Sequence, residues 1–269
     1  MNLKDRVAVI SGAGGGIGRA TALSLARRGC HVALADIDEA GLEATQAQAL
    51  KLGVRASKHR LDVADRAAVA ALPAQTLTSH GRVDLLINNA GVALGGRFDE
   101  VGEADFDWLM EINFHAVVRM TRAFLPALRS SDDARIVNVS SVFGLIAPPS
   151  QCAYSASKFA VRGFSNALRH ELAGTPVGVS VVHPGGVATA IARNARMTQK
   201  VSAEEMRGRL QQIEKKLRLP PEKAAEVIVR GIEKRRARIL VGRDAHLIAL
   251  IERLFPVNYW RVLAPRSQS

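Results

Sequence analysis

Short runs of aliphatic and β-branched residues alternate along the chain with longer stretches that place apolar residues at helical spacing. Several of the short runs are apolar at consecutive positions, which is typical of parallel strands covered on both faces. The predicted strands span residues 7–11, 31–36, 60–63, 84–91, 135–141, 179–185 and 238–242. Helices are predicted between them, most clearly over 18–29, 39–53 and 220–235. This alternation predicts right-handed βαβ crossovers, and therefore an α/β fold: a doubly wound parallel sheet with helices on both faces, in a single domain over residues 1–269.

Two segments depart from this alternation. Residues 190–219 are polar, basic and helix-prone, so we expect an insertion that forms a flap over a ligand at the strand ends. Residues 238–269 are expected to hold the last strand and an amphipathic extension. The apolar positions of that extension share one helix face: Leu247, Leu250, Ile251 and Leu254. Three roles fit it, namely packing or a subunit contact, an interfacial helix on an anionic membrane, or a cover for the cleft.

The basic character of the chain belongs to its C-terminal third. The formal net charge is +12, and residues 190–269 hold 18 Lys or Arg against 8 Asp or Glu. A cluster such as residues 233–238 could meet phosphates or anionic lipid. No aromatic residue lies within that cluster, so a solvated helix face is the simpler interpretation and no nucleic-acid partner is predicted.

The start of the chain and its cysteines indicate the cellular setting. Residues 1–12 enter a strand-like run at once, and the sequence has no run of about 18 apolar residues that could cross a bilayer. We therefore expect a cytoplasmic protein, with peripheral membrane attachment through the C-terminal region as an alternative. Cys30 and Cys152 lack the spacing of metal ligands, so reduced thiols and no metal site are predicted.

A glycine-rich turn, SGAGGGIG over residues 11–18, joins the first predicted strand to the first helix. Its glycines fit a turn whose backbone approaches a pyrophosphate at the helix N-terminus. Asp36 ends the second strand and Asp38 follows it. A carboxylate there accepts hydrogen bonds from ribose hydroxyls and repels a 2′-phosphate, so NAD is favoured over NADP. Arg19 is the nearby cation that could still reach a phosphate.

The stretch YSASK, residues 154–158, places Tyr154 and Lys158 four positions apart and therefore on one helix face. Such a pair by itself is usually part of a surface helix. The surrounding motifs give it a second interpretation. The chain resembles the short-chain dehydrogenase/reductase family over nearly its whole length: residues 11–18 resemble its TGxxxGxG motif with Ser11 in place of threonine, NNAG at 88–91 its central-strand motif, and HPGGVAT at 183–189 its PGxVxT motif.

The resemblance implies a Rossmann fold and a catalytic tetrad of Asn113, Ser141, Tyr154 and Lys158. Two serines compete for the second position, and the family spacing of thirteen residues before the tyrosine selects Ser141 over Ser140. It also implies a cofactor site made by Ser11, Gly12, Gly16, Ile17, Gly18, Asp36, Asp62, Val63, Asn89, Ala90, Gly91, Tyr154, Lys158, Pro184, Val187 and Thr189.

The implied activity is hydride transfer between NAD(H) and a secondary alcohol or ketone. Tyr154 is expected as general acid and base, with its pKa lowered by the Lys158 cation and by oxidised NAD. Lys158 is expected to bind the nicotinamide ribose, and Ser141 the substrate oxygen. Asn113 is expected to hold a water behind Lys158. A homodimer or homotetramer is expected.

The substrate is less well defined by the sequence. The pocket is expected to be lined by members of the flap over residues 190–215 and by Val92, Ala93, Leu94, Val142, Phe143, Pro148 and Gly186. Ser141, Val142, Phe143, Tyr154 and Gly186 are the predicted substrate contacts. Because most of these are apolar, we expect a hydrophobic steroid-, aryl- or acyl-chain-like compound.

Basic residues of the flap, Arg193 and Arg196, could attract a carboxylate. His170 is expected to be structural, and His183 could line the pocket. The alternative function is a non-catalytic NAD(H)-binding regulatory or scaffold protein whose basic C-terminal region binds a membrane or a partner.

Overall fold

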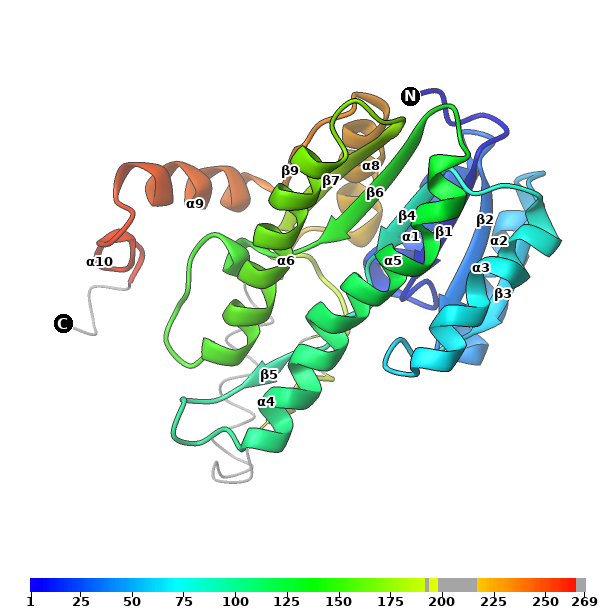
Figure 1. Cartoon of the computed structure of the whole chain (residues 1–269). Coiled ribbons are helices and arrows are strands. Elements are labelled where there is room, and N and C mark those ends of the chain that lie inside the picture. The colour runs from blue at the N-terminus through cyan, green and yellow to red at the C-terminus, as the bar shows by residue number, and fades with distance from the viewer. Residues whose placement is uncertain (192–193, 198–216, 265–269) are drawn as a thin grey trace.

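A seven-stranded parallel sheet forms the centre of the molecule, in the order β3-β2-β1-β4-β6-β7-β9 (Figure 1). The computed structural model describes residues 1–191, 194–197 and 217–264. The strands are β1 (Val7–Ser11), β2 (His31–Asp36), β3 (Ala56–Arg60), β4 (Leu85–Asn88), β6 (Ala134–Val139), β7 (Val177–Pro184) and β9 (Arg238–Val241). The strand order reverses between β1 and β4. In open sheets of this kind the crevice beyond the carboxyl ends at that point is where ligands bind.

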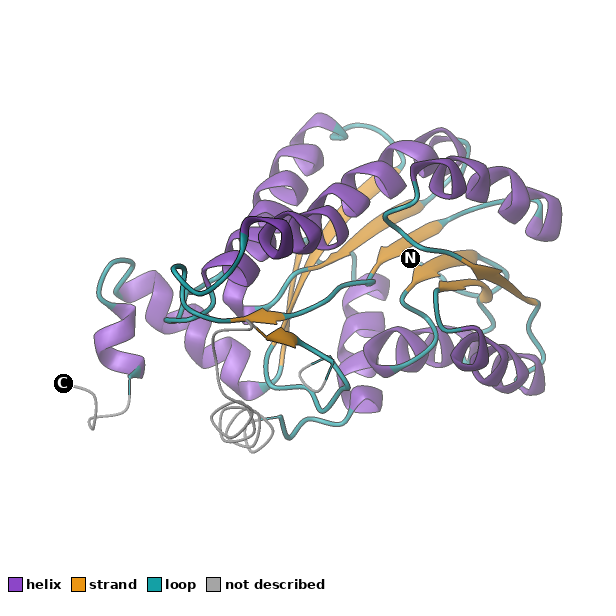
Figure 2. Cartoon of the chain, turned by 90° about the horizontal axis from the view of Figure 1, so that it is seen from below, coloured by secondary structure: helices purple, strands orange, loops and turns teal. Residues whose placement is uncertain are grey.

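Helices cover both faces of the sheet (Figure 2). One face packs against α1 (Gly16–Ala26), α2 (Glu39–Lys51) and α8 (Pro221–Glu233) through a continuous apolar cluster. The other face packs against α3 (Arg66–His80), α5 (Ala116–Arg129) and α6 (Cys152–Glu171) through a second cluster. The doubly wound parallel sheet predicted from the alternating pattern is therefore confirmed.

One predicted strand is displaced along the chain. A strand was expected over residues 60–63, but β3 spans Ala56–Arg60 and ends where the prediction begins. β3 is an edge strand with the sequence ASKHR, so it lacks the apolar run that marks the buried strands. Leu61 and Val63 follow the strand and are buried in the second apolar cluster, while the Asp62 carboxylate accepts a hydrogen bond from the Ala64 N–H.

Smaller elements surround the carboxyl ends of the strands. They are β5 (Leu94–Gly95), α4 (Glu103–Met110), a π-helical turn (Glu111–His115), a 3-10 turn (Val142–Gly144) and β8 (Arg196–Met197). β8 pairs in parallel with β5, which the sequence did not predict. Of the expected flap over residues 190–219, positions 192–193 and 198–216 lie outside the described residues. Arg193 is among these.

A chain of buried amides and hydroxyls joins the sheet to two helices. The Asn88 Nδ2 donates to Asn138 Oδ1 at 2.8 Å and to Thr121 Oγ1 at 3.2 Å. The Asn138 Nδ2 in turn donates to Ser165 Oγ on α6 at 3.0 Å. Because a buried polar group is costly unless it is paired, this network fixes α6 and α5 at one position against β4 and β6.

An ion network joins β1 and β4 at the amino ends of these strands. Asp84, directly before β4, is fully buried and accepts hydrogen bonds from the Val7 N–H at 2.9 Å and from Ser131 Oγ at 2.6 Å. The Arg6 and Arg82 guanidinium groups reach the same carboxylate at 3.0 and 2.6 Å. Burial alone would raise the pKa of Asp84, but these hydrogen bonds outweigh it and leave the pKa below its usual value.

The last described elements are α9 (Arg243–Leu254) and α10 (Tyr259–Leu263), which project from the side of the sheet where β9 lies (Figure 1). α9 buries Ala245 and Ala249, and the Tyr259 hydroxyl accepts a hydrogen bond from the Ala147 N–H at 3.1 Å. Among the described residues, the helices all fall short of the length and apolar character that a membrane span requires.

Candidate active site

The glycine-rich turn is closely packed against the end of β4. Gly12 has φ +68, a conformation that side chains other than glycine rarely adopt. A Cβ on Gly18 would collide with the Gly12 carbonyl and would lie 2.6 Å from the Asn89 Nδ2. The Asn89 amide donates to the carbonyls of Ser11 and Gly12 at 3.0 and 3.2 Å. This backbone therefore presents its N–H groups at the start of α1 without side chains in the way.

Ser11 links the first and fourth strands. Its Oγ accepts hydrogen bonds from the Asn89 and Ala90 N–H groups, both at 3.1 Å. A serine hydroxyl thus makes bonds that the threonine of the family motif could also make, which explains why the substitution is mild. The two strand ends that flank the crevice are held together by it.

Asp36 lies at the predicted ribose position, at the end of β2. Its Oδ2 accepts a hydrogen bond from the Gly14 N–H at 2.7 Å and its Oδ1 one from the Asp38 N–H at 3.0 Å. The Asp38 carboxylate caps α2 by accepting from the Gly41 N–H at 3.0 Å. Two carboxylates therefore lie together beside the turn.

Arg19 is engaged elsewhere. Its guanidinium donates to Thr45 Oγ1 at 3.0 Å, to the Gly41 carbonyl at 3.3 Å and to the Gly14 carbonyl. These bonds join the glycine turn to α2. A group with three acceptors already in place is poorly suited to hold a 2′-phosphate as well.

The other predicted cofactor residues line the same edge of the sheet. A Cβ on Gly16 would meet the Thr189 Cγ2 at 3.3 Å, and one on Gly91 would meet the Lys158 Nζ at 3.4 Å. The structure therefore brings the glycine turn, the NNAG motif and the loop after β7 together. Of the remaining members, Ile17 lies in the first turn of α1 and Pro184 is the last residue of β7. The others follow strand ends: Asp62 and Val63 after β3, Ala90 after β4 and Val187 after β7.

Tyr154 and Lys158 lie one turn apart on α6, with the Lys158 Nζ 5.6 Å from the centre of the Tyr154 ring. Lys158 is buried and donates to the Val139 carbonyl at 3.2 Å. Burial lowers its pKa to about 8. Burial also raises the pKa of Tyr154 to about 12, although a hydrogen bond with the Ser141 side chain acts in the lowering direction.

The expected lowering of the Tyr154 pKa is therefore wrong for the chain's own groups. Lys158 lies over the face of the ring, and loss of solvation around the phenol outweighs the neighbouring hydroxyl. Tyr154 also packs edge-on against Phe143, with ring centres 6.2 Å apart. At neutral pH the phenol is protonated and the lysine is cationic, which is the state that can donate a proton.

Ser140 and Ser141 have different roles. The Ser140 Oγ is buried and donates to the Lys158 carbonyl at 2.8 Å, which holds α6 against β6. The Ser141 Oγ accepts from the Phe143 N–H at 3.1 Å and lies beside the Tyr154 phenol. Of the two serines, Ser141 is therefore the one beside the phenol, and its contact with a substrate stays a prediction.

Asn113 lies in the π-helical turn, and its side-chain amide is fully engaged. Its Oδ1 accepts from the Val92 N–H at 2.8 Å, and its Nδ2 donates to the Val92 carbonyl at 3.0 Å and to Ser157 Oγ at 3.1 Å. The side chain therefore ties the loop after β4 to α6. A water behind Lys158 stays a prediction.

His183 makes a hydrogen bond to the backbone of Ser141. It is fully buried at the end of β7, and its Nδ1 lies 2.9 Å from the Ser141 carbonyl. Because a carbonyl only accepts, the Nδ1 carries the proton. His183 is therefore too buried to line a pocket, as the sequence had allowed, and holds the Ser141 backbone in place instead. His170, at the far end of α6, lies away from Tyr154.

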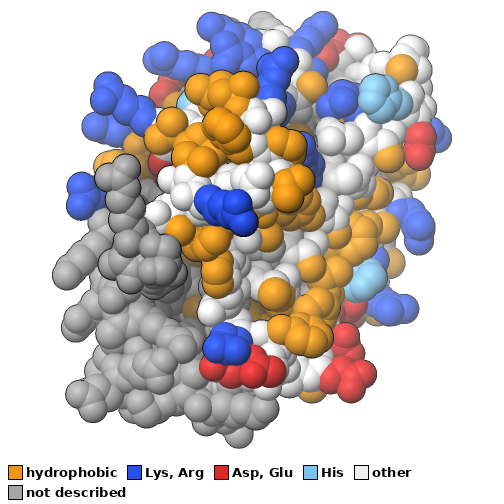
Figure 3. Space-filling model, turned by 90° about the vertical axis from the view of Figure 1, so that its left-hand side faces the viewer, with side chains coloured by type: hydrophobic (Ala, Val, Ile, Leu, Met, Phe, Trp, Pro, Cys, Tyr) orange, Lys and Arg blue, Asp and Glu red, His pale blue; other side chains and the backbone are white. Residues whose placement is uncertain are grey.

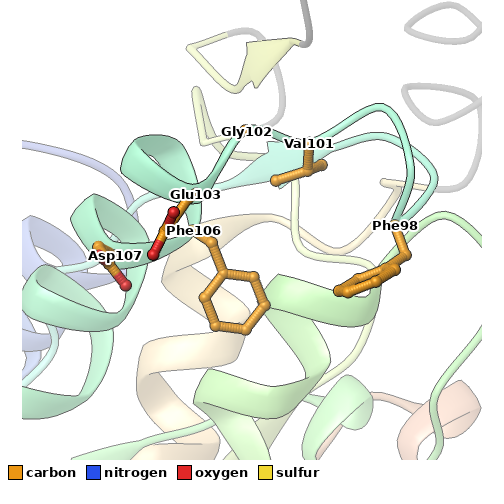
Figure 4. Close-up of a pocket in the computed structure, with 6 residues that line it drawn as sticks. All are labelled: Phe98, Val101, Gly102, Glu103, Phe106 and Asp107. Atoms are coloured by element: carbon orange, nitrogen blue, oxygen red, sulfur yellow. The ribbon is translucent and has the colours of Figure 1, made fainter.

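An apolar cavity of about 300 Å³ opens beside this site, lined by Phe98, Val101, Gly102, Glu103, Phe106 and Asp107 (Figure 4). Figure 4 shows Phe98 and Val101 on the loop before α4 and Phe106 on α4 itself, around the same space. Val101 and Phe106 pack in one cluster with Leu94 and Tyr154. Two residues that line the cavity, Val101 and Phe106, therefore belong to the same packing cluster as the Tyr154 ring.

Sequence reasoning missed these cavity residues, because it placed the pocket directly after NNAG, after Ser141, at Gly186 and in the flap, and not in the segment before Asn113. A signal was present. Phe98, Phe106 and Trp108 lie close together in a chain that is only 4% aromatic. Arg196, which was expected to attract a carboxylate, instead lies 3.3 Å from Asp105 and 3.7 Å above the centre of the Trp108 ring.

Buried histidines predict a loss of stability in acid. The pKa of His183 is lowered to about 4 by burial, against the hydrogen bond to Ser141, and burial and Arg55 lower that of His80 to about 4. Both titrate near 6.5 when unfolded, so below about pH 6.5 the unfolded chain binds protons that the native chain does not. Above that pH the two histidines do not lower the free energy of unfolding. We expect each of them to lower it by about 2 kcal/mol by about pH 5.

Urea titrations at neutral pH and at about pH 5 measure this loss. His80→Asn should remove about half of the contribution of the pair, whereas His246→Asn, at an exposed site on α9, should leave it unchanged. Burial also lowers the pKa values of His31 and His59, which steepens the loss. Equal stability of the wild-type chain at the two pH values would contradict the prediction.

Known proteins match the chain over most of its length. The short chain dehydrogenase family model matches residues 6–200. SadH of Mycobacterium tuberculosis, named as an oxidoreductase, is 43% identical over 266 residues, which are 98% of this chain and 95% of that protein. A short chain dehydrogenase/reductase from Burkholderia phymatum, in complex with NAD, has a TM-score of 0.88 at 33% identity and covers 95% of each chain. A metagenomic short-chain oxidoreductase in complex with NADP has a TM-score of 0.71 at 30% identity, over 90% of this chain and 98% of that one. The chain therefore belongs to the short-chain dehydrogenase/reductase family of oxidoreductases.

Proposed function

We propose that the protein is an NAD(H)-dependent dehydrogenase or ketone reductase that acts on a hydrophobic secondary alcohol or its ketone. The observation that carries this proposal is the meeting of Tyr154, Lys158 and Ser141 beside the glycine turn, at the carboxyl ends of the central strands. A protein that only bound a dinucleotide would not need a partly buried tyrosine and a buried lysine at that point.

The residues of the crevice fit a nicotinamide dinucleotide. The cradle around Gly12 and Gly18 admits no side chain, so backbone N–H groups are free to approach a pyrophosphate. Asp36 would bind the adenosine ribose and Lys158 the nicotinamide ribose. When bound, the dinucleotide supplies or accepts the hydride. The relatives crystallised with NAD and with NADP support this class of cofactor, and Asp36 favours NAD.

The chain's own groups supply the proton. With its pKa raised to about 12, the Tyr154 phenol is protonated at neutral pH and can donate to a carbonyl oxygen during reduction. Ser141 would hold that oxygen beside the phenol. Lys158, cationic below its pKa of about 8, would favour the phenolate that remains. In the oxidation direction the same phenolate would accept the alcohol proton.

The surroundings of Tyr154 support an apolar substrate. Phe143 stacks edge-on against the phenol, and Val101 and Phe106 share its packing cluster. The cavity beyond them offers about 300 Å³ for a ring system or an acyl chain. Among the described residues, no cation lines this cavity, while Glu103 and Asp107 do. We therefore propose a neutral substrate in preference to a carboxylate.

A substrate panel tests this function. Secondary alcohols that range from short and polar to steroid, aryl and long-chain carbinols are incubated with NAD at alkaline pH, and the absorbance of NADH is followed. We expect turnover with kcat/KM that rises with apolar size. If NADH binds in a fluorescence titration but no alcohol or ketone turns over, the protein is a dinucleotide-binding protein and not this enzyme.

Removing the charge of Asp36 should change the choice of cofactor. We expect Asp36→Asn to shift the ratio of kcat/KM for NAD over NADP towards NADP by about tenfold or more, since the carboxylate no longer repels the 2′-phosphate. Asparagine retains an oxygen that can accept from the Gly14 N–H, so the turn is preserved. Steady-state kinetics with both cofactors measure the ratio.

Asp38→Asn serves as the matched control, because its carboxylate caps α2 instead of the glycine turn. It should shift the ratio by much less. If both variants keep the wild-type ratio, Asp36 does not select the cofactor.

A further inference from the structure

The C-terminal helices expose an apolar face that nothing in the described chain covers. The exposed side chains are Leu247 at 56%, Leu250 at 53%, Leu254 at 62%, Phe255 at 47%, Val257 at 85% and Val262 at 52%. We call these six residues the C-terminal apolar face. Scattered single apolar residues are normal on a protein surface, but a contiguous group marks an interaction site.

The three leucines form a stripe along α9. They follow one another at spacings of three and four, while Ala245 and Ala249, on the opposite side, are buried against the body of the protein. α9 is therefore held by its small residues and directs its large ones outward. That arrangement is the reverse of a helix that packs its apolar side into a core.

Cations border this face. Arg243 and Arg253 on α9 and Arg261 on α10 are exposed, and in the part of the chain that the structure describes they have no carboxylate partner. Of the two acids on α9, Asp244 accepts from the Gly186 N–H at 2.7 Å and Glu252 lies 4.0 Å from Arg162. Figure 3 looks onto this side of the molecule and shows hydrophobic side chains with Lys and Arg around them.

We propose that the C-terminal apolar face and its arginines dock on an anionic lipid surface. Apolar side chains at the helix surface enter the boundary between headgroups and acyl chains, and the arginines meet the lipid phosphates and carboxylates. A second copy of the chain fits less well, because a two-fold contact through this face would bring the same arginines against one another.

The docking surface is joined to both loops that flank the site. Tyr259 on α10 is hydrogen-bonded to Ala147, a few residues after Phe143. Asp244, in the first turn of α9, is bonded to Gly186. Docking therefore brings the cleft close to the lipid surface. Entry of an apolar substrate from the bilayer to Tyr154 is an inference that rests on the proposed function. Docking on the lipid surface does not rest on it.

Sedimentation of the full chain with vesicles tests docking without any activity measurement. We expect association with vesicles of phosphatidylcholine and phosphatidylserine at low salt, and release at high salt. The double variant Leu250→Gln, Leu254→Gln should bind at least about tenfold more weakly. Its matched control is Leu50→Gln, Leu52→Gln at the end of α2, where the side chains are 52% and 42% exposed; this control should bind like the wild type.

A charge variant tests the arginines that border the C-terminal apolar face. Arg243→Glu, Arg253→Glu should also lose at least about tenfold in vesicle affinity, while Lys51→Glu, Arg66→Glu, at exposed sites on α2 and α3, should not. No association of the wild-type chain, or equal binding of both C-terminal variants and the wild type, overturns the proposal. It is also overturned if Leu250→Gln, Leu254→Gln lowers the subunit number measured by light scattering, because the face is then a subunit contact.

Discussion

Replacing Tyr154 with Phe is expected to lower kcat by a factor on the order of 10³ in both directions, because the variant has no group that can exchange a proton with the substrate oxygen. The phenyl ring can keep its edge-on contact with Phe143 and its place beside Lys158. We therefore expect NADH to bind within about threefold of its wild-type affinity, which would show that the loss lies in the chemical step.

The measurement is steady-state turnover of the best alcohol from the panel, together with a fluorescence titration of NADH. The chain has just two tyrosines, and the second provides the control. Tyr259→Phe removes a hydroxyl that accepts from the Ala147 N–H, and it should change kcat by less than about threefold. Wild-type turnover in Tyr154→Phe would exclude this tyrosine as the general acid and base.

Adding one methyl group at Gly18 should abolish most cofactor binding. A Cβ there would collide with the Gly12 carbonyl oxygen and lie 2.7 Å from its carbon, and both partners belong to the backbone. Gly12 is held at φ +68, so the turn cannot give way without losing its shape. We expect Gly18→Ala to weaken NADH binding by about 100-fold or more, because the pyrophosphate cradle is no longer formed.

Gly15, three residues earlier in the same turn, gives the matched control. It has φ −164 and ψ −178, which alanine adopts readily, and a Cβ there would meet nothing within 4 Å. Gly15→Ala should keep NADH affinity within about threefold. Fluorescence titration and thermal unfolding of both variants separate lost binding from lost folding. Wild-type affinity in Gly18→Ala would mean that the dinucleotide does not bind at this turn.

The fold could be predicted from the sequence because most of its strands are apolar on both faces. β1, β2, β6 and β7 carry that signal, and their predicted and observed positions agree within two residues. β3 does not carry it, since an edge strand needs no apolar cover, and it was placed too late in the chain. The pairing of β5 with β8 could not be predicted, because each is only two residues long.

The candidate site could be predicted as a set of residues but not as a set of contacts. Ser141, Tyr154 and Lys158 were found through motifs whose spacing is local. The partners of Arg19, Asn113 and Arg196 depend on which backbone groups the fold brings near, which no spacing records. The pKa of Tyr154 depends on burial. The cavity is lined by α4 and the loop before it, which lie between the NNAG motif and Asn113 but belong to neither.

The amino ends and the carboxyl ends of the strands serve different purposes. The ion network around Asp84 joins the amino ends of β1 and β4, whereas every group proposed to act on the substrate lies beyond the carboxyl ends. Loops beyond the carboxyl ends of the strands, such as the segment with Phe98 and Val101, can therefore change in evolution with little effect on the stability of the sheet. We therefore expect substrate preference and foldability to be separable traits of this chain, so that an altered specificity needs no compensating change near Asp84.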